Sequence, residues 1–585
     1  MVAFSWCGPQ GSPGMLNIGP LALSAPLLDR LALRDIIDRH LPGDPQLEYS
    51  HGEILTLLLA ARLAKPTALV NIAAWAEKTG AELLWNISAD KLNDDRIGRS
   101  LDAFFEQRHS IQAAATMHAL RLANLPLARI HFDPTHILFH GDYACSKPRT
   151  SDIIMSPMRS SAQIDPGHIT GSYLSKGQKM LQVANAAVVD DVGAVSIFNH
   201  VLDGNQNSHS AIHEHFQLLR HHLPLPDNLL LVSDRGTFSV GHAQRLADHG
   251  YRVLCSAIWR DFRDVYDSHI SQLDWHRASY LSIEQRRRRD THSSLPHEHY
   301  DIAVVNHTLV DPDSKIVLPC RLLFVYSSAD AKACPHTRRR DCEKIRAGLD
   351  KIVALVGRGH CSTKLDNLPQ RIAKLLGDKA AGRYVRWELQ PLSPQEQAAL
   401  PAPRCGFKRP TQRFVYTLDE SAALADAAYD GLSVLVTTAP LADSGDSLFT
   451  KFKEQNFLES GHHQFKTPLA VSPVFLKSPR RVEALVCLLQ IALQAYQMLE
   501  RLYRQSLPKD APIQEKRTTA ETLLRAFEVH GVITRQTPIG RIIHSTPPNC
   551  RQARILHQLN MPTPGETLSK SLPEAPQPYA ALSLF

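Results

Sequence analysis

The sequence predicts an α/β fold that begins with a helical domain and carries a subdomain inserted in its middle. Apolar residues recur at helical spacing over the first hundred or so residues. Short apolar runs, several of them rich in β-branched residues, follow from Leu125. The pattern loosens after residue 257 and becomes regular again before the C-terminus. The 585 residues therefore divide into five segments: 1–115, 116–256, 257–428, 429–505 and 506–585.

The composition excludes several classes of protein. Hydrophobic residues make up 43% of the chain and charged residues 21%, which excludes a disordered chain. The mean hydropathy is −0.21, and no uninterrupted apolar run approaches the roughly 20 residues of a membrane span. The N-terminus has no basic stretch before an apolar core, so neither a secretory signal nor membrane contact is expected.

Cysteine usage bears on the redox state of the protein's compartment, and net charge bears on the kind of partner it binds. The ten cysteines are scattered and form no Cys-x-x-Cys pair, which argues against a disulfide scaffold or a zinc ribbon and fits the reducing cytoplasm. The net charge of +7 is compatible with a polyanionic partner but is weak support by itself.

The N-terminal segment contains three helix signals. Apolar residues between Leu27 and Leu41 recur at helical spacing, and Ser50 with Glu53 resembles a capping box before a long apolar run. Asn93 precedes a further helical pattern. These helices are consistent with a scaffold, a dimerisation module or a DNA-binding module.

The later segments alternate between strand and helix patterns. We expect strands over 128–139, 182–189, 194–200 and 228–233, with helices over 208–222 and 241–249. The inserted subdomain is expected to be basic, with a helix over 341–356 and strands over 384–389 and 414–418. A strand over 434–438 and helices over 449–466 and 481–503 follow. The C-terminal helical segment suits either dimerisation or packing on the core, and a mobile tail begins near residue 563.

Three carboxylates stand out by their context. Asp133 lies inside a predicted apolar strand, where a carboxylate is costly unless it is paired or binds a metal. Asp234 ends an apolar run before a glycine turn, a position at the carboxyl edge of a sheet where α/β proteins build sites. Glu459 lies on one helical stripe with Phe452, Gln455 and Lys466. Clustered carboxylates are ligands for hard cations such as Mg²⁺ or Mn²⁺, and two such ions support phosphodiester chemistry.

Several motifs appear in a fixed order along the chain. Asp133 begins D-x-T-x(5)-G-x-Y, Asp234 is the centre of V-S-D-R-G, and Glu459 begins E-x(6)-K. These motifs resemble the DDE transposases of bacterial insertion sequences, in the IS-four-type superfamily. The stretches LNDDRIGRSLDAFFE (92–106) and PVFLKSPRRVEAL (473–485) resemble the branch with a helical N-terminal domain.

The resemblance implies an RNase H-like catalytic core, a mixed sheet flanked by helices and interrupted by an insertion between the second Asp and the Glu. It implies that Asp133, Asp234 and Glu459 are catalytic and hold Mg²⁺, which Mn²⁺ can replace. It also implies DNA or phosphate contacts, which we assign to Lys466, Gln455, Phe452, His463 and Arg235. The superfamily has Tyr and Arg where this chain has Phe452 and Gln455, so the hydroxyl and the charge are lost at these two positions.

The implied function is DNA transposition by a bacterial, nucleoid-associated enzyme. It would bind the terminal inverted repeats of its element as double-stranded DNA, pair two ends as a homodimer, cleave, and join the ends to target DNA. A nuclease without strand transfer and a catalytically inactive or domesticated DNA-binding protein remain alternatives.

The individual residues also have simpler interpretations. Asp133 and Asp234 taken singly are turn residues, Lys466 is equally a solvated helix end, and His463 is more readily a surface histidine. Glu454 and Glu483 compete with Glu459 as the third carboxylate but lack its spacing to a lysine. The His213-Glu214-His215 stretch lacks the H-E-x-x-H spacing of a zinc helix.

Overall fold

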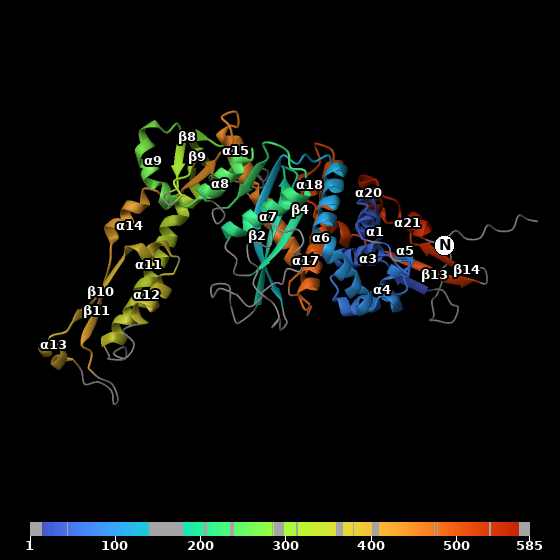
Figure 1. Ribbon diagram of the computed structural model, residues 1–585, viewed down its shortest axis with the longest axis horizontal. Helices are drawn as coiled ribbons and strands as arrows, with labels where there is room; N and C mark the ends of the chain where they lie inside the picture. Colours follow the sequence, from blue (N-terminus) through green and yellow to red (C-terminus); the bar gives the residue numbers. More distant parts are fainter. Residues whose placement is uncertain are drawn as a thin grey trace, which may run out of the picture.

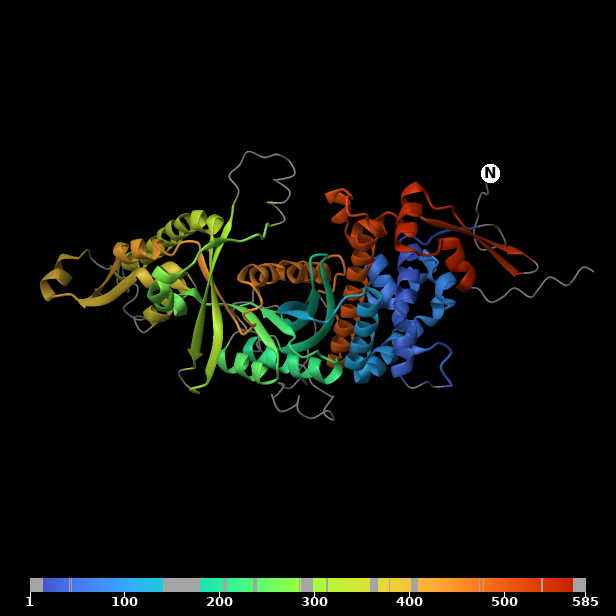
Figure 2. The ribbon, with the colours of Figure 1, turned by 90° about the horizontal axis from the view of Figure 1, so that it is seen from above.

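The computed structural model of the chain describes residues 14–41, 43, 45–139, 179–203, 208–234, 239–282, 285, 298–311, 314–357, 367–377, 379–400, 409–472, 474–476, 478–537 and 540–571. Figures 1 and 2 show an elongated molecule with helices at one end, a large sheet in the middle and a projecting arm at the other end. It is a mixed α/β structure, as the sequence predicts.

The N-terminal helices follow the sequence signals closely. Ser50 and Glu53 form the predicted capping box, and the Asn93 side chain accepts a hydrogen bond from the Arg96 amide at the start of the longest of these helices. The pattern from Leu27 to Leu41 is divided between two helices, because the backbone at Ala32 adopts φ 50° and interrupts the helical path. The helices are α1 (Leu21–Arg30), α2 (Leu33–His40), α3 (His51–Ala64), α4 (Ile72–Thr79), α5 (Ala81–Trp85) and α6 (Asp94–Leu122).

The large sheet has nine strands in the order β4-β3-β2-β5-β6-β12-β9-β8-β7. The β2, β3 and β4 strands pair antiparallel, β5 and β6 continue the sheet parallel to β2, and the remaining pairs are antiparallel. The strands are β2 (Arg129–Phe139), β3 (Lys179–Val189), β4 (Ala194–Asp203), β5 (Leu230–Ser233), β6 (Arg252–Ala257), β7 (His276–Arg277), β8 (Tyr300–Val310), β9 (Val317–Ser327) and β12 (Leu432–Thr437).

Helices cover both faces of this sheet. On one face lie α7 (Ser208–His222), against β2, β3 and β4, and α8 (Val240–Asp248), against β6 and β9. On the other face lie α15 (Gly445–Lys453), α16 (Gln455–Lys466) and α17 (Pro479–Ser506), with α6 beside α17 (Figure 1). The short α9 (Arg263–His269) follows β6.

Helix α17 is buried along most of its length, from Val482 to Tyr503. It packs on α3, α6, α16, α19, α20 and β4, and so joins the N-terminal helices to the sheet. Its length and composition would allow it to cross a membrane, but its apolar window is wholly buried inside the protein, and the core helix of a soluble protein passes the same test.

A long arm, residues 328–430, leaves the sheet after β9 and returns at β12 (Figure 2). It has its own core, to which Ile345, Leu349, Tyr384 and Phe414 contribute. It consists of α11 (Ser328–Gly357), α12 (Leu368–Leu376), β10 (Val385–Pro391), α13 (Pro394–Ala399), β11 (Gln412–Leu418) and α14 (Glu420–Ala427), with β10 and β11 paired antiparallel.

The C-terminal segment packs against the N-terminal helices. Its strands β13 (Gly531–Thr537) and β14 (Gly540–Ser545) form a hairpin, and β1 (Gly14–Asn17) adds a third, antiparallel strand. The helices of this segment are α18 (Ile513–Lys516), α19 (Ala520–Arg525), α20 (Cys550–Leu559) and α21 (Pro564–Ser571). The mobile tail expected from residue 563 is wrong for residues 564–571, which form α21 and pack on α1 and α5, and the tail lies outside the described residues from 572 onward.

Two further expectations differ from the structure. Residues 257–327, expected to belong to the insertion, contain the unpredicted strands β7, β8 and β9, which extend the large sheet, and the segment that leaves the sheet begins at residue 328. The single helix expected over 449–466 is two helices, α15 and α16. Between them the Phe457 amide bonds the carbonyl of Glu454, three residues earlier, which tightens the backbone turn at this point.

Candidate active site

Strand register places two predicted aspartates side by side at one edge of the large sheet. Phe132 of β2 pairs with Ser233 of the parallel strand β5, so the next residues, Asp133 and Asp234, occupy neighbouring positions. Strand β6 runs parallel to β5 and brings Ser256 beside Asp234. The Ser256 hydroxyl donates a 2.7 Å hydrogen bond to Oδ1 of Asp234. We call the sheet edge that carries Asp133, Asp234 and Ser256 the carboxylate edge.

Helix α16 lies over β2 and carries the predicted glutamate and lysine. Its first residue, Gln455, is buried, and its Oε1 lies 2.6 Å from Nδ1 of His131. Burial lowers the pKa of His131 to about 3, so the ring is neutral and Nδ1–H donates this bond. Seven residues further along, His462 Nδ1 lies 3.4 Å from Oδ2 of Asp133. Glu459 lies between these two contacts on the same helix.

The charges of the predicted residues act on one another. The pKa of Asp133 is raised to about 7, first by burial and then by the charges of Asp234 and Glu459, while Lys466 opposes the rise. Burial lowers the pKa of Lys466, and the charge of Asp133 partly offsets this effect. The structure therefore brings Asp133, Asp234, Glu459 and Lys466 into one electrostatic cluster.

Two residues of this site, Ser256 and His462, were not predicted from the sequence as site residues. Ser256 becomes recognisable only through the strand register, because nothing local marks a serine in β6 as a partner of Asp234. His462 had a usable signal, since it lies three residues after Glu459 and hence on nearly the same face of the helix. Burial and the charge of Lys466 lower the pKa of His462 to about 4, so the ring beside Asp133 is neutral at pH 7.

The other predicted contact residues have different surroundings. Gln455 is engaged within the core, where its Nε2 also donates a 3.4 Å hydrogen bond to the carbonyl of Phe132. Phe452, on α15, is partly buried and packs with the apolar cluster that contains Leu448 and Phe449. His463 is exposed. Arg235 lies outside the described residues, as do Gly141 and Tyr143 of the first motif.

Both alternative glutamates are engaged in ion pairs elsewhere. Glu454 lies 2.6 Å from the guanidinium of Arg129, and Glu483 lies 2.7 Å from that of Arg108 in the core. Glu459 is the one of the three whose charge acts on Asp133. It is therefore the glutamate that fits the third position.

The donor set of the cluster suits a hard divalent cation. Within the described parts of the chain, no three His, Cys, Asp or Glu side chains are arranged as a ready metal site. The cluster nevertheless offers carboxylate oxygens, which Mg²⁺ and Mn²⁺ prefer. After burial, the charges of Asp234 and Glu459 contribute to the raised pKa of Asp133, and a divalent cation would offset that repulsion.

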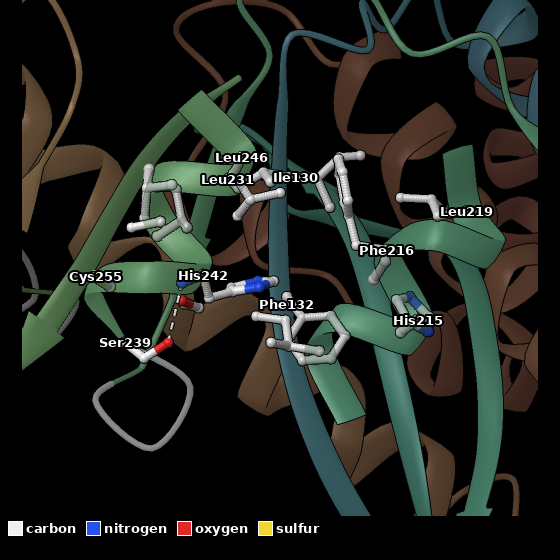
Figure 3. A pocket seen from close by; sticks show the side chains of 16 residues that line it. Ile130, Phe132, His215, Phe216, Leu219, Leu231, Ser239, His242, Leu246 and Cys255 are labelled. Carbon is white, nitrogen blue, oxygen red and sulfur yellow. Dashed lines mark hydrogen bonds between the residues drawn. The ribbon is translucent and has the colours of Figure 1, made fainter. Parts of the chain in front are cut away.

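A small cavity lies behind the carboxylate edge, under α7 and α8. Its volume is about 30 Å³, and Phe132, His215 and His242 are among the side chains around it (Figure 3). Burial lowers the pKa of His215 to about 3, so this ring is neutral. The cavity is apolar and water-sized, so it belongs to the core and not to a substrate site.

Comparison with known proteins gives one family match. Residues 15–112, which span the N-terminal helices, match a domain of unknown function, DUF4277. No curated protein matches the chain.

Two solved structures show distant similarity to the chain. One is a piggyBac transposase synaptic complex with hairpin DNA, at 9% identity and a TM-score of 0.35, covering 96% of this chain and 87% of that one. The other is a Mos1 transposase paired-end complex with the left transposon end, at 12% identity and a TM-score of 0.13, covering 36% of this chain and 60% of that one. Neither superposition is close enough to establish a shared fold.

Proposed function

We propose that the chain is a DNA transposase of the DDE type that cleaves DNA and joins the cut ends to a target. The observation that carries this proposal is the electrostatic cluster at the carboxylate edge. Asp133 and Asp234 come from adjacent parallel strands, and Glu459 and Lys466 come from the helix above them. Sheet edges of this kind are where α/β proteins build their sites.

The arrangement of strands supports an RNase H-like core for this activity. Three antiparallel strands, β4, β3 and β2, are followed by β5 and β6 parallel to β2, which is the arrangement of that fold. The order of the sequence motifs supports membership in the IS-four-type superfamily. The arm enters between the second aspartate and the glutamate, where that superfamily has its insertion.

Each residue of the cluster has a role that follows from its contacts. Asp133, Asp234 and Glu459 would hold Mg²⁺ or Mn²⁺, and an ion held there would supply Lewis-acid stabilisation of the attacking and leaving oxygens. Ser256 fixes the orientation of the Asp234 carboxylate through its hydrogen bond. Neutral His462 lies beside Asp133, with its Nδ1 3.4 Å from Oδ2 of the carboxylate. Lys466 offers a cation to a phosphate beside the carboxylates.

The proposed partners are the terminal inverted repeats of the element and a target duplex, held by a homodimer that pairs two ends. We assign recognition of the ends to the helical N-terminal segment, residues 1–115. The proposed location is the bacterial cytoplasm, in association with the nucleoid.

The proposal is tested with purified protein, duplex DNA that carries the inverted repeats flanking its gene, and Mg²⁺ or Mn²⁺. Asp234→Ala should abolish cleavage at the repeat end while the protein remains folded. The matched control is Asp191→Ala, which removes an exposed aspartate from the turn between β3 and β4 and should leave cleavage unchanged.

The products separate the alternatives. Cleavage and a covalent product with target DNA support the transposase, whereas cleavage without that product indicates a nuclease. Specific binding with no cleavage by the unaltered protein would overturn the proposal and indicate a DNA-binding protein without catalysis.

A further inference from the structure

The arm begins and ends at the carboxylate edge. Strand β9 is antiparallel to β12, and β12 is antiparallel to β6, so β9 runs parallel to β6 and ends at the same edge. Helix α11 starts at the next residue, Ser328, and the chain returns from α14 to begin β12 at Leu432. The arm therefore leaves the sheet at the edge that carries Asp234. Figure 2 shows the arm projecting away from the sheet.

The arm also carries most of the excess positive charge of the protein. Residues 328–430 contain 18 Lys and Arg against 12 Asp and Glu, a net charge of +6, while the whole chain has +7. The remaining 482 residues are thus almost neutral in sum. A charge concentrated in this way marks an electrostatic binding surface more clearly than the overall charge does.

Five of the arm's cations share the exposed face of α11. The buried face of this helix carries Ile345, Leu349, Ile352 and Val356. At about 100° per residue, the side opposite that face carries five exposed cations, Lys332, Arg339, Arg340, Lys344 and Lys351. Glu343 and Asp350 lie on the same side, so the face keeps an excess of three positive charges.

Most of these cations are available to a partner. Arg340 lies 3.8 Å from Asp341. Lys332, Arg339, Lys344 and Lys351 form no ion pair with any residue that the structure describes. A phosphate would meet little competition for them.

The groove at the base of the arm differs from the exposed face of α11, because its arginines are paired with carboxylates. It has a volume of about 510 Å³ and is lined by arginines, but their charges are neutralised within it. Asp426 accepts from Arg263 at 2.8 Å and also pairs with Arg383, and Asp430 pairs with Arg338. The arginines of the groove are therefore engaged with carboxylates, whereas four cations on the outer face of α11 have no ion pair among the described residues.

We propose that the exposed face of α11 binds the phosphate backbone of duplex DNA without reading its sequence. Lys332 and Lys351 are 19 residues apart, about 28 Å along a helix at 1.5 Å per residue. This is close to one turn of B-form DNA, about 34 Å. Lys and Arg contacts to phosphates supply affinity and position but carry no base information.

This inference rests on the proposed function only for the choice of DNA as the polyanion. Its test measures DNA binding and does not depend on cleavage. The probe is a 40-base-pair duplex of random sequence, and the measurement is the salt dependence of its affinity for the full chain. The variant is Arg339→Glu/Lys344→Glu/Lys351→Glu. The matched control, Lys509→Glu/Lys516→Glu/Arg525→Glu, changes charge by the same amount at exposed positions of the C-terminal segment.

The slope of log affinity against log salt should become shallower by about 2 to 3 in the arm variant, at about 0.9 per phosphate contact. The control should keep the wild-type slope. An unchanged slope in the arm variant, or an equal change in both variants, would overturn the proposal.

A second variant separates charge from folding. Arg339→Gln/Lys344→Gln/Lys351→Gln removes the positive charges without adding negative ones, and it should lose the same contacts while keeping the circular dichroism and unfolding curve of the wild type. Asp234→Ala should retain the full salt slope. The cleavage assay with Asp234→Ala tests the proposed function, and the salt slope of the arm variants tests DNA binding by α11. Either proposal can therefore fail while the other holds.

Discussion

At the scale of single residues, Asp133 shows the cost of assembling the site. Its side chain is 28% exposed, yet burial and two neighbouring carboxylates raise its pKa to about 7. An aspartate in an unfolded chain titrates near 3.8, so the folded protein holds a proton between these pH values that the unfolded chain has released. The stability of the metal-free protein must therefore fall as the pH rises from about 4 to about 7.

The substitution Asp133→Asn should remove this dependence. In EDTA at pH 8, the variant should be more stable than the wild type by on the order of 2 kcal/mol, because one pKa unit corresponds to about 1.4 kcal/mol and partial exposure reduces the effect. Near pH 4 the two proteins should be equally stable. Urea unfolding at both pH values measures the difference, and coincident curves at pH 8 would contradict the raised pKa.

Ser256 is expected to act through Asp234. Ser256→Ala should raise the Mg²⁺ concentration needed for half-maximal cleavage by about 10-fold, because residues that orient metal ligands typically have effects of this size. Cleavage at saturating metal and the unfolding curve should change little, and Ser256→Thr should restore the metal requirement. Ser460→Ala is the control, since that exposed hydroxyl of α16 bonds only the carbonyl of Asn456, at 2.9 Å.

At the scale of elements, α16 is a helix held on the sheet by polar contacts as well as apolar ones. The Gln455 amide bonds both the His131 ring and the Phe132 carbonyl, on the strand that carries Asp133. The helix therefore positions Glu459 relative to Asp133 through contacts at its first turn and at His462.

Gln455→Ala should destabilise the protein by about 1 to 3 kcal/mol, because it leaves the buried His131 ring without its partner. The midpoint of urea unfolding measures this, with the neighbouring exposed Asn456→Ala as control. If the Gln455 amide instead contacts phosphate, the substitution will weaken DNA binding and leave the unfolding midpoint unchanged.

The sequence predicted those elements whose signals are local. The capping box at Ser50, the cap at Asn93 and the strand that ends before Asp234 all lie within a few residues of what they determine. Strand β1 was missed because its partner β13 lies more than 500 residues away. Strands β8 and β9 were missed for a related reason, since their place in the large sheet depends on tertiary contacts and not on a local pattern.

The distinction between local signals and long-range contacts also applies to the candidate site. The order of the motifs predicted that Asp133, Asp234, Glu459 and Lys466 belong to one site. Ser256 could not be predicted, because only the register of β5 and β6 places it beside Asp234.

At the scale of the whole molecule, the N-terminal helices are continuous with the large sheet. Helix α6 packs along α17 and reaches β4, where Gln112 bonds Asn199 at 2.9 Å and Thr116 bonds the carbonyl of Ile197. The helices that match the family of unknown function therefore share a core with the rest of the chain.

Deletion of residues 1–110 should consequently abolish folding and not only DNA-end recognition. The cut falls inside α6 and would expose the apolar side of α17 over a large area, while proteins are stable by only about 5 to 15 kcal/mol. Circular dichroism and a cooperative unfolding transition test this directly. A truncated protein that unfolds cooperatively would show that the N-terminal helices are a separable domain.

The position of the arm has a consequence for how this architecture can change over time. Strands β9 and β12 are antiparallel neighbours, with Tyr326 opposite Leu432, and the Ser327 amide bonds the carbonyl of Gly431 at 2.8 Å. Gly431 already has a positive φ of 84°, which suits a tight turn. The two ends of the arm thus meet as the two strands of a hairpin do. A single genetic event could exchange the arm for a short turn, or for another module, without altering the register of any strand that carries a carboxylate.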